Sequence, residues 1–251
     1  MRGAVLVAGS HGGLIASYLG AKAGAHALIL NDAGVGLDDA GIAGLQWLNA
    51  IGMAAATVAH TSARIGDGTD SLARGVISHA NQSARTVGVV TGMRAAAAAA
   101  CLTRASALHS PPPPYVEGRW LLTRRNGIEV WALDSVGKLL PDDAGRILLI
   151  GSHGALHGGR RDSALNLHGA PVQARAAIFN DAGVGADGAG ITRLAELDAR
   201  GIPAATVSHT SARIGDGRSM WETGVLSYIN SHAASMDWLV GMRVPDAVLL
   251  A

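Results

Sequence analysis

The chain has 251 residues, of which 49% are hydrophobic, and its formal net charge at pH 7 is +1. Its 20 Lys and Arg are spread along the sequence, so there is no basic field of the kind that binds nucleic acid. A single cysteine excludes an internal disulfide and a Cys-x-x-Cys metal site, and it is typical of a protein from the reducing cytoplasm. The sequence contains no run of about 18 apolar residues, so no membrane span is predicted.

Short apolar runs, each followed by a polar turn, predict three buried parallel strands in each half of the chain. They are Ala4–Ala8, His26–Leu30 and Met53–Ala59, and later Ile147–Ile150, Ala176–Phe179 and Pro203–Ser208. The first run follows the basic start Met1-Arg2, as the apolar stretch of a signal peptide does, but a polar turn interrupts the run. The same pattern also recurs inside the chain, so it predicts a strand.

Two long segments of the chain are nearly the same. Residues 31–94 and 180–243 align without a gap and are identical at 35 of 64 positions. The block Gly9-Ser10-His11-Gly12 also returns as Gly151-Ser152-His153-Gly154. Core positions tolerate exchange among apolar residues of similar size. Here the apolar positions differ while Ser, His, Asn, Asp, Thr and Arg are kept, and this predicts a site in both segments.

Helices are expected between these strands. Asp38 and Asp187 are predicted N-caps, and Gly52 and Gly201 are predicted to end the same helices. A later helix is predicted from about Asp70 to Val87. It would place Gly75, Ser78 and Asn81 on one small polar face suited to close packing between the halves.

Residues 95–145 have no counterpart elsewhere in the chain. Ala95–Ala100 predicts a helix, and Pro111–Pro114 predicts a stiff extended spacer. Asn126-Gly127, between two apolar stretches, predicts a β-hairpin with a type I′ turn. This hairpin could cover a sheet edge or bridge the halves.

The predicted fold is therefore α/β, with two tandem homologous halves of parallel βα-repeats related by pseudo-two-fold symmetry and a central hairpin insertion. The expected boundaries are residues 1–94 for the first half, 95–145 for the connecting helix, spacer and hairpin, and 146–251 for the second half.

The polar blocks all follow predicted strands, and ligands bind beyond the carboxyl ends of strands in open parallel sheets. The Gly-Ser-His-Gly turns could present backbone N–H groups to a phosphate or carboxylate. They contribute the predicted substrate-binding residues Ser10, Gly12, Ser152 and Gly154. A tight strand-to-helix turn is the structural alternative.

Histidines at the strand ends are the predicted proton carriers, because imidazole titrates near neutral pH. The predicted catalytic groups are His11, His60 and Asp32 with their counterparts His153, His209 and Asp181. The aspartates would orient the histidines. The structural alternatives are histidines hydrogen-bonded at loop ends and an Asx turn at Asn31-Asp32.

Further predicted substrate-binding residues are Asn31, Ser62 and Arg64, with Asn180, Ser211 and Arg213. An arginine among small residues at a strand end suits bidentate capture of an anion. Asp67 is assigned to turn formation or to an ion pair with Arg64.

Three other interpretations stay open. A Ser or Thr nucleophile beside His60 lacks the GxSxG turn. A metal site made by His11, His60 and Asp32 lacks a diagnostic spacing. The glycine-hinged insertion His157-Gly158-Gly159-Arg160-Arg161 suits either a lid or a surface loop.

Together these patterns predict an enzyme that acts on a small anionic metabolite by His/Asp acid–base chemistry, of the hydrolase or lyase/isomerase type. No cofactor, metal, nucleic acid or membrane partner is expected, and homo-oligomerisation stays open. One alternative is a non-catalytic protein that binds or senses a small anion. Another is a scaffold assembled through the repeated faces.

Overall fold

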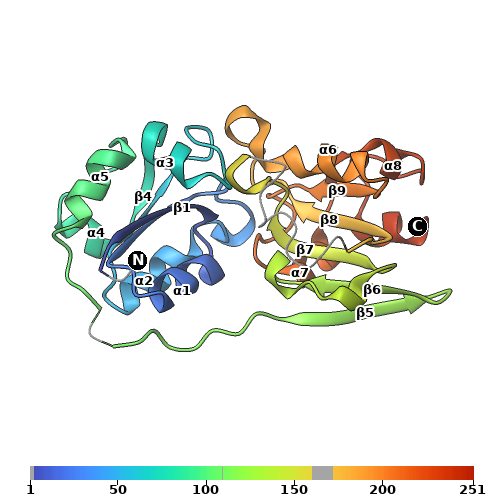
Figure 1. The fold of residues 1–251 in the computed structure, drawn as a ribbon, viewed down its shortest axis with the longest axis horizontal. Helices are drawn as coiled ribbons and strands as arrows, with labels where there is room; N and C mark the ends of the chain where they lie inside the picture. The colour runs from blue at the N-terminus through green and yellow to red at the C-terminus, as the bar shows by residue number, and fades with distance from the viewer. Residues whose placement is uncertain (1–2, 109, 160–171) are drawn as a thin grey trace.

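The computed structural model describes residues 3–108, 110–159 and 172–251. It shows an α/β protein with two mixed, mostly parallel sheets, lying side by side in Figure 1. All six predicted strands are present. The apolar runs of the inner strands are buried on both faces of the sheet, whereas those of the edge strand that contains Val5 to Ala8 are half-buried.

The first sheet has four strands in the order β1-β2-β3-β4. Its strands are β1 (Val5–His11), β2 (Ala27–Asn31), β3 (Ala55–Val58) and β4 (Ile77–Ala80). The first three are parallel and β4 is antiparallel to β3. One face is covered by α1 (Leu14–Lys22) and α2 (Ala43–Ala50), and the other by α4 (Gln82–Thr86) and α5 (Ala95–Leu102). The helix α3 (Gly68–Arg74) packs against β1.

The second sheet has six strands in the order β10-β9-β8-β7-β6-β5. They are β5 (Arg119–Arg125), β6 (Ile128–Leu133), β7 (Ile147–His153), β8 (Ala176–Asn180), β9 (Ala204–Val207) and β10 (Leu226–Ile229). The helices here are α6 (Thr192–Ala199), α7 (Gly217–Thr223), α8 (Ser231–Ala234) and α9 (Val244–Leu249). Strands β6 to β9 are parallel, while β5 and β10 are antiparallel edges.

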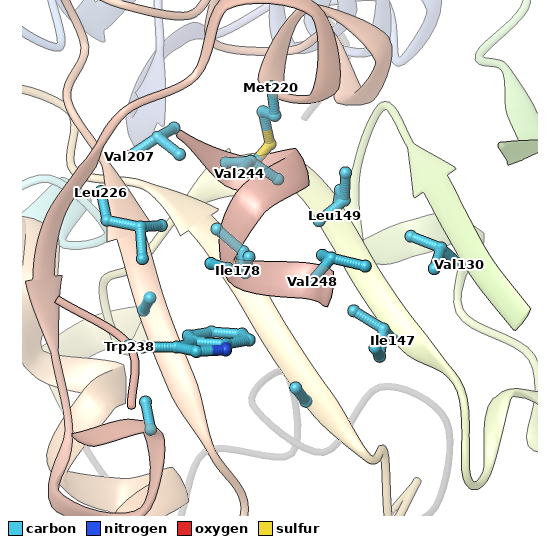
Figure 2. Close-up of a cluster of buried hydrophobic side chains, with 14 of the residues drawn as sticks. Val130, Ile147, Leu149, Ile178, Val207, Met220, Leu226, Trp238, Val244 and Val248 are labelled. Atoms are coloured by element: carbon cyan, nitrogen blue, oxygen red, sulfur yellow. The ribbon is translucent and has the colours of Figure 1, made fainter. Parts of the chain in front are cut away.

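Figure 2 shows the apolar face of the second sheet beneath α9. Val244 and Val248 of α9 lie over Leu149 and Ile178 of the strands, and Trp238 is fully buried beside them. This cluster is one of the two apolar layers that hold the second sheet between its helices, the other lying under α6. The strand ends are therefore presented by a rigid core.

The predicted hairpin is present. Asn126 and Gly127 have φ angles of 48° and 78°, as a type I′ turn requires. Strand β6 pairs in parallel with β7, so the hairpin extends the second sheet and covers an edge. The proline-rich stretch before it is extended and runs from the first sheet to the second (Figure 1).

The single helix predicted for residues 70–87 is wrong. Helix α3 ends at Arg74, β4 follows, and α4 begins after Asn81. The spacing of Ser78 and Asn81 has another cause, because both bond to β3 in the sheet. Ser78 Oγ lies 3.1 Å from Thr57 Oγ1, and the Ala55 N–H donates to Asn81 Oδ1 at 3.1 Å.

The N-cap assignments of Asp38 and Asp187 are also wrong. Both residues have positive φ, 55° and 57°, inside 3-10 turns that precede α2 and α6. Their carboxylates pair with arginines of the opposite half. Gly52 and Gly201 do follow the ends of these helices, with φ of 80° and 70° as predicted.

Candidate functional site

The carboxyl ends of the parallel strands in the two sheets face each other. The loops that follow these strands form hydrogen bonds across the contact between the halves, which we call the junction. The Leu37 N–H donates to the His209 carbonyl at 2.8 Å, and the Ala186 N–H donates to the His60 carbonyl at 2.7 Å. A buried apolar cluster draws members from both halves, among them Ala33, Ile65, Ala155, Ala182 and Ile214. The blocks that are identical in sequence therefore meet at this junction.

The loops after β2 and β8 have an unusual backbone. In the first, four successive residues have positive φ: Ala33 (51°), Gly34 (75°), Val35 (63°) and Gly36 (75°). The loop after β8 repeats these values at residues 182–185, namely 50°, 75°, 62° and 71°. A β-branched residue in this region is strained, and such strain persists only where the surroundings impose it. The loops place the aspartates and bring the two halves into contact.

Gly34 and Gly183 touch across the junction, and each also contacts a histidine of the other half. A Cβ on Gly34 would lie 2.8 Å from His209 Cδ2 and 3.1 Å from Gly183 Cα. A Cβ on Gly183 would lie 2.8 Å from His60 Cδ2 and 3.0 Å from Gly34 Cα. Only glycine fits here, because the positive φ and the close approach both exclude a side chain.

One oxygen of Asp32 makes three hydrogen bonds, and two of them hold His60 in place. Asp32 Oδ1 lies 2.9 Å from His60 Nδ1, and it accepts the N–H groups of His60 at 2.8 Å and Gly34 at 3.1 Å. Burial acts to raise the pKa of Asp32, but hydrogen bonds from His60, Gly34 and Ser78 outweigh it and lower the pKa below its usual value. Asp32 is therefore a carboxylate at neutral pH.

The second half contains the same arrangement. Asp181 Oδ1 lies 3.0 Å from His209 Nδ1 and accepts the N–H groups of His209 at 2.9 Å and Gly183 at 3.0 Å. Burial again acts to raise the pKa of Asp181, and hydrogen bonds from His209, Gly183 and Ser227 lower it further than burial raises it. We call these two pairs the junction dyads.

The outer edge of each dyad histidine is open. The side chains of His60 and His209 are 26% and 25% exposed, whereas those of Asp32 and Asp181 are 5% and 4% exposed. Within the described residues, neither Nε2 atom has a hydrogen-bond partner. A carboxylate accepts only from a protonated Nδ1, so the neutral imidazole keeps its lone pair on Nε2.

His11 and His153 are in a different environment from the dyad histidines. Each Nδ1 accepts a backbone N–H at 3.2 Å, from Gly13 and Ala155 respectively. Burial lowers the pKa of His11 to about 4, and burial together with nearby positive groups lowers the pKa of His153 well below its usual value. Both rings are neutral at pH 7. Because each Nδ1 accepts a hydrogen bond, the ring proton is on Nε2, and these histidines could take part in proton transfer only by donating from Nε2.

Most of the other repeated polar groups already have partners inside the protein. Buried Asn31 donates to the Ala63 carbonyl and accepts the Ala33 N–H, and Asn180 repeats both bonds. Ser62 and Ser211 likewise join two loop segments.

The glycine turns are also internally bonded. The N–H groups of Gly12 and Gly154 donate to the carbonyls of Asn31 and Asn180, at 2.7 and 2.9 Å. Ser152 accepts the Val136 N–H, while Ser10 is exposed. Of the polar groups in these two turns, the exposed Ser10 hydroxyl is thus the one left most clearly available to a ligand.

The two arginines lie in ion-pair clusters. Arg64 bonds Asp67 at 3.2 Å, Asp70 at 3.1 Å and, across the junction, Asp187 at 3.4 Å. The predicted pair of Arg64 with Asp67 is confirmed, and Asp67 also caps α3. Arg213 bonds Asp216 at 2.9 Å and, across the junction, Asp38 at 3.0 Å.

Sequence reasoning missed a group of residues around a cavity of about 490 Å³ beside Arg213. Asp134, Tyr115 and Trp120 come from the unrepeated segment, where the search for shared residues could not find them. Asp134 directly follows β6, a parallel strand, so the strand-end rule that singled out His60 would also have found it.

The part of the chain that the structure describes has no group of three or more His, Cys, Asp or Glu side chains placed to hold a metal ion. The arrangement of His11, His60 and Asp32 as ligands is thus not assembled. Of the insertion at residues 157–161, His157–Gly159 form a 3-10 turn, and Arg160 and Arg161 lie outside the described residues. No described helix is long and apolar enough to cross a membrane.

Comparisons with family models, curated proteins and solved structures found no match for this chain.

Proposed function

We propose that the protein is an enzyme that acts on a small anionic metabolite by acid–base catalysis at the junction dyads. The observation that carries this proposal is the state of His60 and His209. In each, a buried aspartate binds Nδ1 while Nε2 has no partner among the described residues. A histidine oriented in this way is a general base, and the aspartate stabilises the imidazolium that forms.

The surroundings of Nε2 favour hydrolysis or lyase/isomerase chemistry over a covalent serine mechanism. No hydroxyl in the described residues bonds either Nε2, and the Ser62 and Ser211 hydroxyls donate to backbone carbonyls. The base would therefore act on a water molecule or directly on a substrate C–H. Water gives hydrolysis, and proton removal from carbon gives elimination or isomerisation.

The anion would be held by Arg64 and Arg213 through exchange of partners. Each guanidinium already binds a carboxylate of the opposite half, and Asp187 and Asp38 are the more exposed partners at 53% and 62%. Each of these contacts joins one guanidinium nitrogen to one carboxylate oxygen, and a substrate carboxylate or phosphate could replace the aspartates and bind in the bidentate geometry that arginine favours. The ion pairs in the free protein support this part of the proposal because they show that anions are accommodated there.

We further propose that the halves are homologous and related by a pseudo-two-fold axis between Gly34 and Gly183. The support is the sequence repeat together with the matching bonds of the two dyads. Because each histidine packs on the opposite half, one composite site is favoured over two independent ones.

The test begins with incubation of the protein with small carboxylates and phosphates, followed by NMR to find the compound consumed. The variants are His60→Gln, His209→Gln and the double variant. A composite site predicts that either single substitution lowers turnover about 10²-fold or more. Independent sites predict that about half the activity remains in each single variant.

His232→Gln is the matched control. His232 pairs with Asp198 at 3.0 Å through Nδ1, as the dyad histidines do, but this pair is on the exposed surface near α8. It should leave turnover unchanged. Full turnover in the double variant of His60 and His209 would refute the proposal.

A second candidate is a non-catalytic protein that binds a small anion, and the paired arginines favour it. It predicts that the melting temperature rises with one class of anion and that no compound is consumed. Replacement of Arg64 and Arg213 by alanine should then abolish the rise, while the double histidine variant should keep it.

A further inference from the structure

The cavity beside Arg213 lies between the two halves, is partly open to solvent, and is lined on one side by the segment that joins them. Leu14 and Ile15 of α1 form the wall on the first-half side. The opposite wall includes Asp216, at the start of α7, and Trp120 of β5. Tyr115, from the extended segment before β5, also lines the cavity.

The lining of this cavity has an excess of negative charge. It contains four carboxylates and two guanidinium groups, a formal difference of two negative charges; the residues are Asp38, Asp134, Asp216, Glu222, Arg213 and Arg218. Arg213 bonds Asp38 and Asp216, and Arg218 lies 3.9 Å from Glu222. Asp134 has no cationic partner among the described residues.

Asp134 is the buried carboxylate of the cavity, at 7% exposure. Its oxygens accept only backbone N–H groups, from Gly118 at 2.6 Å and Gly217 at 3.3 Å. Burial raises the pKa of Asp134, and the nearby charges of Asp216 and Glu117 raise it further. Glu117 Oε1 is also buried and has no hydrogen-bond partner in the described part of the chain. A bound cation would relieve this concentration of negative charge.

The rest of the lining suits an organic body on that cation. Leu14, Ile15 and Ile214 line the cavity with apolar groups, and Tyr115 and Trp120 contribute aromatic rings, with the Arg218 guanidinium 5.5 Å from the centre of the Trp120 ring. Aromatic faces attract cations and also pack against flat apolar groups. A volume of about 490 Å³ is within the range of small-molecule sites, roughly 300–1,000 Å³.

We propose that this cavity binds a small organic cation, a primary amine with an apolar or aromatic body, with its ammonium group at Asp134 and Asp216. None of the four dyad residues lines the cavity, so the proposal does not depend on the catalytic role of His60 and His209, although Arg213, which the proposed function gives to the substrate anion, is part of the lining.

Among the described residues, the surroundings of Gly66, the corresponding glycine of the first half, differ from those of Gly215. There, Leu156 and Gly158 cover Gly66. A Cβ on Gly66 would lie 2.7 Å from the Leu156 carbonyl oxygen. The Gly158 N–H also donates to the Gly66 carbonyl at 2.6 Å. A Cβ on Gly215, the counterpart of Gly66, would meet only His11 Cε1, at 3.4 Å. Because Tyr115, Trp120 and Asp134 come from the segment that has no counterpart in the chain, we expect a single amine site.

The test is isothermal titration calorimetry with phenethylamine, compared with phenethyl alcohol and 3-phenylpropionate as neutral and anionic analogues. We expect one phenethylamine per chain and at least about tenfold weaker binding of both analogues, as loss of a charge-assisted bond predicts. No binding of phenethylamine at millimolar concentration, or equal binding of the neutral analogue, would overturn the proposal.

Asp216→Asn and Asp67→Asn form a matched pair of variants. Each aspartate caps a helix and accepts an N–H at 2.9 Å, and asparagine is an equally good cap. Only Asp216 lines the cavity. Asp216→Asn should weaken phenethylamine binding about tenfold and Asp67→Asn should leave it unchanged. Equal effects of the two substitutions would overturn the proposal.

Asp134→Asn should weaken binding at least as strongly as Asp216→Asn. If that variant fails to fold because Gly118 and Gly217 lose an acceptor, Glu222→Gln serves instead, since Glu222 is half exposed on α7. Binding of phenethylamine by the His209→Gln variant separates this site from the dyads. If that variant no longer binds the amine, the cavity is not the independent site proposed.

Discussion

The loops after β2 and β8 are identical in sequence and nearly identical in backbone, whereas the surroundings of Gly66 and Gly215 differ. The identical loops contact each other across the junction, so a change in one would have to be matched in the other. Gly66 and Gly215 face different segments, with Leu156 and Gly158 against Gly66 and His11 beside Gly215. Residue identity in these two loops therefore coincides with mutual contact, although Gly66 and Gly215 also lie in identical blocks. The function proposed above rests on the histidine nitrogens that this contact leaves without partners among the described residues.

The largest effect on stability is expected where the loops touch. Gly34→Ala or Gly183→Ala forces a Cβ into a contact below 3 Å at a positive φ. The expected loss is about 2–5 kcal/mol, combining the left-handed backbone with overpacking. Urea unfolding measures it.

Gly52→Ala is the control for the backbone contribution, since Gly52 has φ of 80° with open space around it. It should cost about 1–2 kcal/mol. Equal losses at Gly34 and Gly52 would show that the junction contact contributes nothing to stability.

The buried histidines predict a marked loss of stability in acid. The pKa of His11 is about 4 in the folded protein and about 6.5 when unfolded, so between these values only the unfolded state binds the proton. Stability should fall as the pH is lowered from about 6.5 to 4. His11 accounts for about 3 kcal/mol of this fall.

His11→Asn tests this prediction, because asparagine can still accept the Gly13 N–H. The variant should lose about 3 kcal/mol less than the parent protein between pH 7 and pH 4, measured by urea unfolding at each pH. His153 is buried in the same way, so part of the loss of stability in acid should remain in the variant. The same pH dependence in both proteins would contradict the buried neutral state of His11.

The smallest effect is expected at the cross-junction ion pairs. Asp187 pairs with Arg64 and Arg74, whereas Asp38 pairs with Arg213. These side chains are more than a third exposed, so Asp187→Asn and Asp38→Asn should each cost under about 1 kcal/mol. Both substitutions should strengthen binding of the substrate anion by freeing a guanidinium. Weaker anion binding would show that the aspartates are not competing with the anion.

Local patterns predicted the strands, the hairpin turn and the helix-ending glycines because each depends on neighbouring residues in sequence. The helix predicted for residues 70–87 failed because β4 depends on distant bonds from Ser78 and Asn81 to β3. The sequence also could not show that Asn31, Gly12 and Ser62 bond within the protein, since their partners come from other loops. Asp134 was missed because it has no repeated counterpart.

The measurement that tests the central claim most directly is the tautomeric state of the histidines, by long-range proton–nitrogen NMR of ¹⁵N-labelled protein. The structure requires neutral His60 and His209 to carry the proton on Nδ1 and keep a bare Nε2, because Asp32 and Asp181 accept at Nδ1. His11 and His153, whose Nδ1 atoms accept backbone N–H groups, should show the opposite tautomer. A proton on Nε2 of neutral His60 and His209 would remove the general base and contradict the account.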